Sequence, residues 1–428
     1  MKNSKAPDVD VVVIGAGAAG LAAAVELEKA GLRLAIFEAR HRIGGRILTH
    51  RDPLAPLPIE LGAEFVHGRA PEILDIAKRI PIPLCEVSWN PAERREGKWR
   101  NDLDLESESQ PILEEAVHYR GPDMSWANFA AQSKAPASQR RSATRFVEGF
   151  NAARAERISV LSIQQDTLAA QAMDDDHQFR MPSGYDRIPR FLASRLQATV
   201  RLATPVHHIS WTEGQVEING ELTARAAVIT LPVGVLQARS VVFDPVPDPV
   251  KAAGDIECGQ VFRVMLRLED ALWESHPDLR GAGFLFTDSE PFPTWWTTLP
   301  LRSPLITAWC AGPHVDGLPG SSDEIARAAI EALGQLLGQD VRSQVRAWYL
   351  HNWHDDPWAR CAYSYARAGR LAARNEMATP AADTLFFAGE AAETEGHSGT
   401  VHGAIRSGQR AARMVIETRS AAGSRASM

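Results

Sequence analysis

Residues 10–25, DVVVIGAGAAGLAAAV, pass from a continuous apolar run into a run of small residues in which glycine recurs at short intervals. A short apolar run next to glycine is typical of a buried strand, and an alanine-rich run of this length is typical of a helix. The pattern predicts a strand, a tight turn and a helix that Gly31 closes. A second strand is expected over residues 33–38.

The rest of the chain changes pattern several times. Residues 86–180 are polar and favour helices, with little strand signal, and short β-type runs return over 185–235. Between residues 261 and 350, apolar runs separated by turn residues predict an antiparallel sheet with one inserted helix. The end of the chain returns to strand and helix.

Glycine- and alanine-rich α/β segments therefore stand at the start, in the middle and near the end of the chain. This order predicts an α/β protein in which a Rossmann-type nucleotide-binding domain is interleaved with an α+β substrate-binding domain of antiparallel sheet and helices. We expect the first domain to comprise residues 1–85, 186–258 and 370–420, the second to comprise 86–185 and 259–369, and a tail to follow over 421–428.

Composition narrows the class of protein. The chain has 428 residues, which is long for one core, and its 45% hydrophobic and 23% charged residues are typical of a globular protein. The formal net charge of -7 argues against a nucleic-acid partner, because binding to phosphates usually needs a basic face.

Cysteine and histidine usage indicates neither a metal site nor a disulfide framework. The 4 cysteines form no C-x-x-C pair, and a reducing cytoplasm is the expected location. His351 and His354 are close in sequence, but no further ligand completes a metal set. No stretch approaches the roughly 20 apolar residues that a membrane span needs.

The first turn carries a G-x-G-x-x-G motif made of Gly15, Gly17 and Gly20. In a dinucleotide site the first glycine permits the turn, the second lets the backbone approach a pyrophosphate, and the third lets the helix pack on the strand. The helix N-terminus then offers unpaired amides to the phosphates. Glu38 ends the second strand, where a carboxylate can accept hydrogen bonds from ribose hydroxyls. Together these features predict a dinucleotide site.

EARHRIGGR, residues 38–46, adds Arg40 and Arg46 around a Gly44-Gly45 turn. Two guanidiniums beside a flexible turn can hold a pyrophosphate. A solvated basic loop has the same composition, and the glycine motif alone does not distinguish FAD from NAD.

A series of motifs closely resembles the flavin-containing amine oxidases, the family of monoamine oxidases, polyamine oxidases and flavin-type histone lysine demethylases. The resemblance runs from about residue 8 to residue 417. In chain order the motifs are VIGAGAAGLAAA, EARHRIGGR, LGAEFVHG, TLPVGVL, DPWARCAYSY, FFAGEA and TVHGAIRSGQRAA.

This resemblance implies a bound FAD. Glu38 would hold the adenosine ribose, Arg40 and Arg46 the pyrophosphate side, Val206 the adenine, and Glu390 the ribityl or phosphate region. The linkage motif of monoamine oxidases, SGC, is absent, so FAD is expected to bind without a covalent bond.

The resemblance also places residues beside the flavin ring. Residues 62–65 would pass next to it, and Thr400 and Val401 would open a helix whose N-terminus points at the pyrimidine edge. The complete set of implied cofactor residues is Gly15, Gly17, Ala18, Gly20, Glu38, Ala39, Arg40, Gly45, Arg46, Gly62, Ala63, Glu64, Phe65, Val206, Gly389, Glu390, Thr400 and Val401.

The chemistry that the resemblance implies is oxidation of a C–N bond. The α-carbon of a neutral primary or secondary amine delivers a hydride to flavin N5, the imine hydrolyses to an aldehyde, and O2 reoxidises the flavin to give H2O2. Polyamines are one candidate class of substrate. Positioning and desolvation can carry much of such a reaction, so it requires no strong general base.

Four residues are expected to face the amine or the flavin. Tyr363 matches the first of two tyrosines that hold the amine in monoamine oxidases, and Thr400 takes the place of the second, which would leave a half-open cage. His67 matches the position of a substrate-facing His or Glu in polyamine oxidases, although a hydrogen-bonded residue near the core is the alternative. Trp353 is expected near the flavin, with simple packing as its alternative.

One position departs from the family. A lysine usually holds a water at flavin N5, whereas this chain has Arg263. Arginine keeps the charge but is bulkier and does not deprotonate, so altered oxygen reactivity is expected. An L-amino-acid oxidase, with Arg263 binding the substrate carboxylate, and a flavin-binding protein with little turnover are the alternatives. Cys361 replaces a glycine of a related motif, so the sequence does not predict the geometry of the local turn. It does not predict the oligomeric state either.

Overall fold

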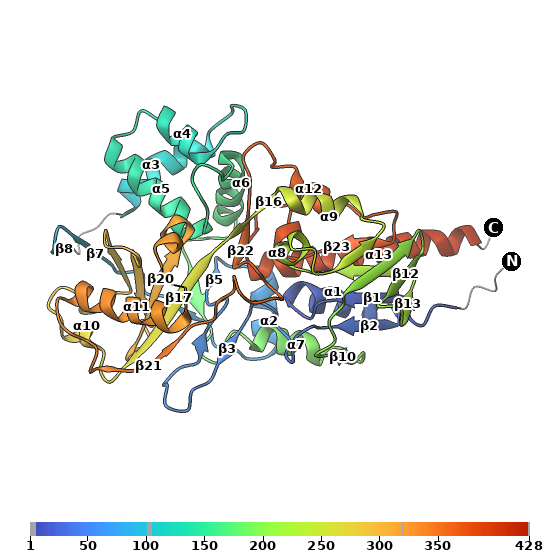
Figure 1. Ribbon diagram of the computed structural model, residues 1–428, viewed down its shortest axis with the longest axis horizontal. Helices are drawn as coiled ribbons and strands as arrows, with labels where there is room; N and C mark the ends of the chain where they lie inside the picture. Colours follow the sequence, from blue (N-terminus) through green and yellow to red (C-terminus); the bar gives the residue numbers. More distant parts are fainter. Residues whose placement is uncertain (1–5, 101–104, 319, 427–428) are drawn as a thin grey trace.

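The computed structural model describes residues 6–100, 105–318 and 320–426. A five-stranded parallel sheet lies at the end of the molecule that holds both chain termini (Figure 1). Its strands, in order across the sheet, are β10 (Val200–Arg201), β2 (Leu34–Phe37), β1 (Val11–Ile14), β14 (Ala226–Ile229) and β23 (Leu385–Phe387). Continuous runs of Val, Ile and Ala suit a parallel sheet that is buried on both faces. Three distant parts of the sequence thus build one sheet, and the predicted domain boundaries stay a prediction.

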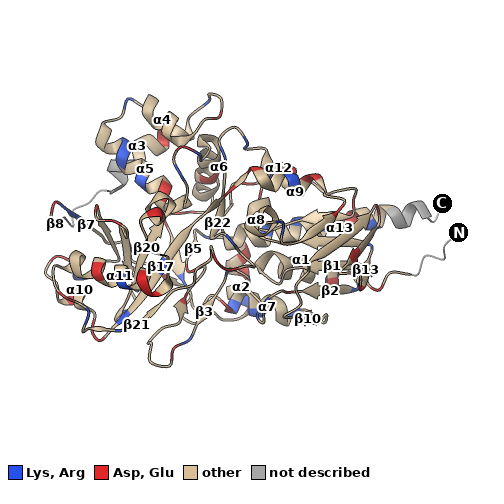
Figure 2. Ribbon diagram, in the orientation of Figure 1, with Lys and Arg blue, Asp and Glu red and all other residues tan. Residues whose placement is uncertain are grey.

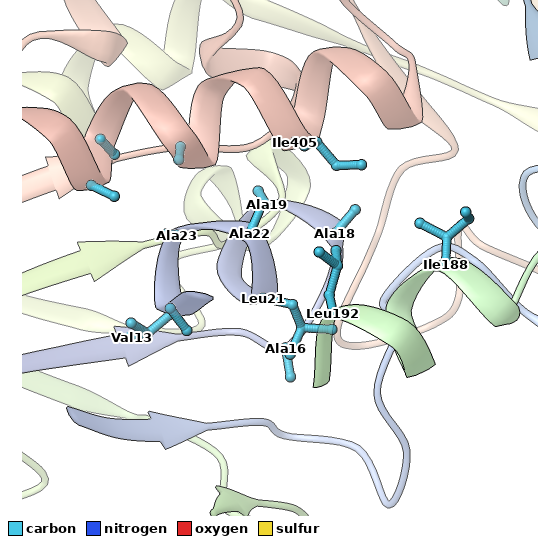
Figure 3. Close-up of a cluster of buried hydrophobic side chains, with 14 of the residues drawn as sticks. Val13, Ala16, Ala18, Ala19, Leu21, Ala22, Ala23, Ile188, Leu192 and Ile405 are labelled. Carbon is cyan, nitrogen blue, oxygen red and sulfur yellow. The ribbon is translucent and has the colours of Figure 1, made fainter. Parts of the chain in front are cut away.

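The alanines of α1 (Ala18–Lys29) let this helix pack closely between neighbouring elements. Figure 3 shows the small side chains Ala19 and Ala22 between α1 and α13 (Val401–Ala426), near Ile405. On another side of α1, Leu21 points toward α7 (Arg187–Ser194). The helix α1 ends just before Gly31, whose φ is +78°, as the sequence predicts.

A seven-stranded sheet forms the other end of the molecule (Figure 1). Its order is β21 (Val345–Tyr349), β17 (Val261–Leu268), β20 (Leu305–Ala311), β19 (Thr294–Thr297), β18 (Phe284–Thr287), β7 (Pro91–Arg95) and β8 (Lys98–Arg100). The pairs from β21 to β18 are antiparallel, and α11 (Ser322–Leu337) packs on them, which confirms the predicted sheet and inserted helix. The parallel pair β18–β7 lies outside this prediction.

Small sheets join these two parts. They are β13 (Leu222–Ala224), β12 (Gln215–Ile218), β11 (His208–Thr212) and β15 (Val242–Asp244); β16 (Ile256–Gly259) with β22 (Tyr363–Ala366); β5 (Val66–His67), β9 (Gln178–Arg180) and β6 (Cys85–Glu86); and β3 (Thr49–His50) with β4 (Ile59–Glu60). The segment 86–180, which was expected to be mainly helical, therefore also contains short strands: β9 lies between β5 and β6 and pairs antiparallel with both.

The remaining helices cover these sheets. They are α2 (Pro71–Arg79), α3 (Leu105–Val117), α4 (Trp126–Gln132), α5 (Ala137–Asn151), α6 (Val160–Gln171), α8 (Val233–Gln237), α9 (Asp248–Ala252), α10 (Leu272–Ser275) and α12 (Ala373–Ala378). Charged residues of both signs lie on the outer elements, for example on α11 (Figure 2). Within the described ranges, no helix combines the length and the apolar character that crossing a membrane requires.

The tail expected over 421–428 belongs to the domain division, which stays a prediction. Helix α13 continues to Ala426, and only residues 427–428 lie outside the described part of the chain. The sequence AAGSRA contains alanines and an arginine that extend a helix already started by the packed face of α13.

Gly408 tests the close packing of α13 on α1. A Cβ at this position would overlap the carbonyl oxygen of Ala19, so Gly408→Ala should lower the free energy of unfolding by about 2 kcal/mol through overpacking. Gly149 in α5 is the matched control, because a Cβ there meets no atom within 4 Å. Gly149→Ala should be neutral or raise stability by up to about 1 kcal/mol. Thermal unfolding midpoints measure both, and equal midpoints would contradict the tight contact.

Candidate active site

The turn between β1 and α1 forms a cradle of backbone amides. Gly15 has φ of +103°, and a Cβ on Gly20 would overlap the Gly15 carbonyl oxygen, so both positions need glycine. Gly17 precedes α1 in an extended conformation and makes no side-chain cap to the helix. The first amides of α1, beginning at Ala18, are therefore open to an anion.

Glu38 stands beside this cradle at the end of β2. Its side chain is buried, and its two oxygens accept hydrogen bonds from the amides of Ala16 (2.8 Å) and Arg40 (2.9 Å). These bonds hold the carboxylate between the glycine turn and the following loop, next to Ala39. A carboxylate oxygen has two lone pairs, so Glu38 could still accept ribose hydroxyls.

The Gly44-Gly45 turn lies directly against the cradle. Gly44 forms a parallel bridge with Gly17, and its amide donates to Ala16 O at 2.8 Å. A Cβ on Gly45 would come within 3.3 Å of Gly17 Cα. This placement favours the interpretation that the loop binds a cofactor over the interpretation that it is a solvated basic loop.

Both arginines of that loop are ion-paired with residues from the end of the chain. Arg40 Nη2 lies 2.6 Å from Asp356 Oδ1, and Arg46 Nη1 lies 2.9 Å from Glu390 Oε1. Burial would raise the pKa of Asp356, but hydrogen bonds from His351 and Arg40 lower it overall. The sequence pointed to the two guanidiniums but not to the pairing of Arg40 with Asp356, because nothing local relates residues that are hundreds of positions apart.

Glu390 connects three segments. Its Oε2 accepts hydrogen bonds from the Ser364 hydroxyl at 2.7 Å and from the Gly399 amide at 3.2 Å, while Oε1 binds Arg46. Burial would raise the pKa of Glu390, but Arg46 and Arg374 lower it, so the buried carboxylate is ionised. Gly389, with φ of +128°, turns the chain from β23 into this position.

Thr400 caps α13. Its hydroxyl donates to His397 O at 2.7 Å and accepts from the Gly403 amide at 3.0 Å, and Val401 is the first helical residue. The predicted helix start is therefore confirmed. The Thr400 hydroxyl is bound to backbone groups on both sides. The resemblance had instead led us to expect it as one wall of the amine cage.

Tyr363 lies next to this helix start. A Cβ on Gly399 would come within 3.4 Å of the Tyr363 ring, and the Tyr363 hydroxyl donates to Phe150 O at 2.7 Å. Burial raises the pKa of Tyr363, so the phenol stays neutral. The thiol of buried Cys361 donates to Tyr363 O at 3.1 Å. The local turn therefore accommodates cysteine where a related motif has glycine.

His67 belongs to a group of aromatic rings. Its ring contacts Phe150 edge-on at 5.9 Å and Phe65 at 6.2 Å, and Phe65 contacts Trp296 at 5.6 Å. Burial lowers the pKa of His67 to about 4, because nothing nearby stabilises the charged ring. Among the described residues no side chain donates to or accepts from the imidazole in a hydrogen bond, which argues against the alternative of a hydrogen-bonded core histidine.

Arg263 is paired with Glu64. Arg263 Nη1 lies 3.1 Å from Glu64 Oε2, and the same carboxylate binds Arg180 Nε at 2.8 Å and Trp296 Nε1 at 3.2 Å. Burial lowers the pKa of Arg263 and Glu64 opposes this shift. Arg180 had no sequence signal, since it stands alone on the short strand β9. A guanidinium already bound to Glu64 does not favour the binding of an amino-acid carboxylate at Arg263.

Trp353 and the segment 62–65 lie together. Trp353 is buried, and its indole donates to Leu61 O at 2.9 Å. A Cβ on Gly62 would overlap the Arg46 carbonyl oxygen, and the Ala63 amide donates to that oxygen at 3.2 Å. The segment 62–65 is thus held against the Arg46 loop. Val206, the expected adenine contact, is buried in the cluster beside β2 and β14.

These residues fit a flavin dinucleotide. The cradle leaves helix amides open toward phosphates, and buried Arg263 Nη2 and Arg180 Nη2 have no hydrogen-bond partner in the described part of the chain. Buried donors of this kind suit a polar ring edge. The described residues contain no group of three or more His, Cys, Asp and Glu that could hold a metal ion.

Comparisons with known proteins agree with this geometry. Polyamine oxidase 3 of Oryza sativa subsp. japonica is 27% identical over 94% of this chain and 88% of its own length. The Arabidopsis thaliana protein named lysine-specific histone demethylase 1 homolog 3 is 26% identical over 95% of this chain, which spans only 30% of that relative. A solved structure of wild-type putrescine oxidase bound to putrescine has a TM-score of 0.82 at 23% identity and covers 96% of this chain and 99% of its own. This likeness confirms the predicted two-domain fold.

The family described as flavin-containing amine oxidoreductases matches residues 18–416, almost the whole chain. The chain therefore belongs to this family, as its motifs predict, and it is an FAD-dependent enzyme that oxidises amines.

Proposed function

We propose that the enzyme oxidises a small primary or secondary amine beside Tyr363, with FAD bound without a covalent link, and releases an imine and H2O2. One observation carries this assignment. Arg46 Nη1 binds both Glu390 Oε1 (2.9 Å) and Ala362 O (3.0 Å), so the cofactor loop and the residue before Tyr363 belong to one network. Cofactor and amine would therefore meet at Tyr363.

The first part of the chain would bind the dinucleotide. The amides of Gly17, which precedes α1, and of Ala18, the first residue of α1, would hold the pyrophosphate, together with the turn at Gly45. Glu38 would accept the ribose hydroxyls, and Val206 would meet the adenine. These roles need only open amides and a fixed carboxylate, which the uncapped helix and the two bonds to Glu38 supply.

Residues from the last helix would serve the flavin ring. FAD supplies the acceptor for the hydride that leaves the α-carbon of the amine. The N-terminus of α13 at Thr400 and Val401 would stabilise negative charge at the ring, an effect of up to about 1 kcal/mol. Gly389, Glu390 and the segment 62–65 would hold the ring in place.

The aromatic group would hold the amine. Tyr363, His67 and Phe150 form an apolar wall in which His67 is neutral, so an uncharged amine would meet no fixed positive charge there. Trp353 would support the segment beside the flavin rather than touch the substrate, because its indole is bound to Leu61 O. Arg263 would provide the positive group near O2 that a lysine provides in related enzymes.

The identity of the amine is the finer part of the proposal. Polyamines are the class that the name of the rice relative indicates. The apolar wall supports amines with a hydrophobic body as the second class. The free thiols of the described cysteines support a reducing compartment, and we place the enzyme in the cytoplasm.

Anaerobic titration of the purified yellow protein tests the proposal. Benzylamine or putrescine should bleach the oxidised flavin absorbance, and leucine should leave it unchanged. Bleaching by leucine alone would favour an amino-acid oxidase. Bleaching by none of a broad panel of amines would leave a flavin-binding protein without turnover and would contradict the proposal.

Tyr363 should act through its ring. Tyr363→Phe keeps the ring and loses only the hydrogen bond to Phe150 O, so flavin reduction should slow by no more than about fivefold, the equivalent of roughly 1 kcal/mol. Tyr363→Ala removes the wall and should slow the reduction by well over tenfold. Stopped-flow reduction at equal FAD content measures both, and equal rates for the two variants would exclude a role for the ring.

The pH dependence of flavin reduction should reflect the pKa of the substrate amine and not the pKa of His67. Since burial lowers the pKa of His67 to about 4, this residue is protonated only below that pH and stays neutral from pH 6 to 9. The rate of flavin reduction at limiting substrate should therefore rise with pH as the amine loses its proton. His67→Gln should leave the midpoint of this rise unchanged, while an amine of different pKa should move it. A midpoint that shifts with His67→Gln would show that the histidine titrates in this range.

A further inference from the structure

Glu64 is shared by two arginines. Its carboxylate accepts hydrogen bonds from Arg180, Arg263 and Trp296, and both guanidiniums are more than nine-tenths buried. Three donors on its two oxygens hold this carboxylate in place. Arg263, whose Nη1 is bound to this carboxylate, is fixed with it.

Arg180 is itself held firmly. Its Nη1 donates to Leu299 O at 3.3 Å, and its guanidinium lies over the Phe65 ring at 4.9 Å. It stands on β9, where the neighbouring Gln178 pairs with His67 of β5. One small sheet therefore fixes both Arg180 and the histidine of the aromatic wall.

The charges of this cluster do not cancel. Arg263 and Glu64 alone make a neutral pair, so the excess positive charge comes from Arg180. The nearby Glu60 accepts bonds from the Tyr185 amide and the Thr49 hydroxyl, and burial raises its pKa to about 7. At neutral pH Glu60 therefore carries only part of a negative charge and does not fully balance Arg180.

We propose that Arg180 is a positioning residue for amine oxidation: by sharing Glu64 with Arg263, it keeps the Arg263 guanidinium in place and keeps the site net positive. The inference rests on the proposed placement of Arg263 near the flavin. A buried positive charge interacts strongly because the surroundings screen it weakly. It stabilises the negative charge that the reduced flavin and O2 acquire, so it raises the reduction potential and speeds reoxidation.

Two substitutions separate charge from hydrogen bonding. Arg180→Lys keeps the charge, and Arg180→Gln keeps a donor toward Glu64 but removes the charge. The flavin midpoint potential, the FAD content and the rate of reoxidation by O2 are measured on each FAD-loaded protein. Arg180→Gln should lower the potential and slow reoxidation at least fivefold, whereas Arg180→Lys should stay within twofold of the unchanged enzyme.

A third variant keeps the inference testable if Arg180→Gln fails to bind FAD. Glu64→Gln removes the negative charge, so the potential of the flavin that it retains should rise. An unchanged potential in Arg180→Gln, an equal fall in Arg180→Lys, or a fall in Glu64→Gln would each overturn the inference. These outcomes leave the proposed function intact, which fails instead when the unchanged enzyme binds FAD but no amine bleaches it.

Discussion

The ion pair between Arg46 and Glu390 is the contact on which the arrangement of the site depends. Arg46 also binds Ala362 O, and Glu390 also binds Ser364 and the Gly399 amide. One buried pair thus joins the loop after the glycine turn, the strand that begins at Tyr363 and the residue before the cap of α13. Removing one partner would leave an unpaired buried charge, which typically costs about 3–5 kcal/mol. Cofactor loop, aromatic wall and helix N-terminus are therefore fixed as one unit.

Ion pairs between distant segments occur at two further places around the site. Arg40 pairs with Asp356, and Glu64 pairs with Arg263, so charged residues of the first segment meet partners hundreds of positions later. Buried ion pairs add little net stability, because desolvation offsets most of the attraction. Their role here is geometric, because each pair holds two segments that are distant in the sequence against each other. The apolar packing of α1 on α13 provides stability, and the ion pairs decide how the parts are aligned.

This division explains how far the sequence could predict the structure. The glycine turn, the helix α1, the antiparallel strands from β17 to β21 and the start of α13 follow from local periodicity and turn residues, so they were predicted correctly. Arg180 and Asp356 were missed because their roles come from pairing across the fold, which leaves no periodic signal. The composition of residues 421–426 allows either a loose end or a continued helix, and in the structure α13 continues to Ala426.

The structure differs in one respect from the half-open cage that the sequence resemblance implies. Sequence comparison opposes Tyr363 with the hydroxyl of Thr400, but that hydroxyl is bound to His397 O and the Gly403 amide. The ring of Tyr363 instead lies against Gly399, where φ is +71° and a Cβ would come within 3.4 Å of the ring. Thr400 therefore marks the start of α13 beside Tyr363, and its hydroxyl serves as the helix cap. The contact between Tyr363 and the start of α13 is therefore made by a ring against backbone, and it depends on glycine at position 399, whose φ of +71° residues with a side chain rarely adopt.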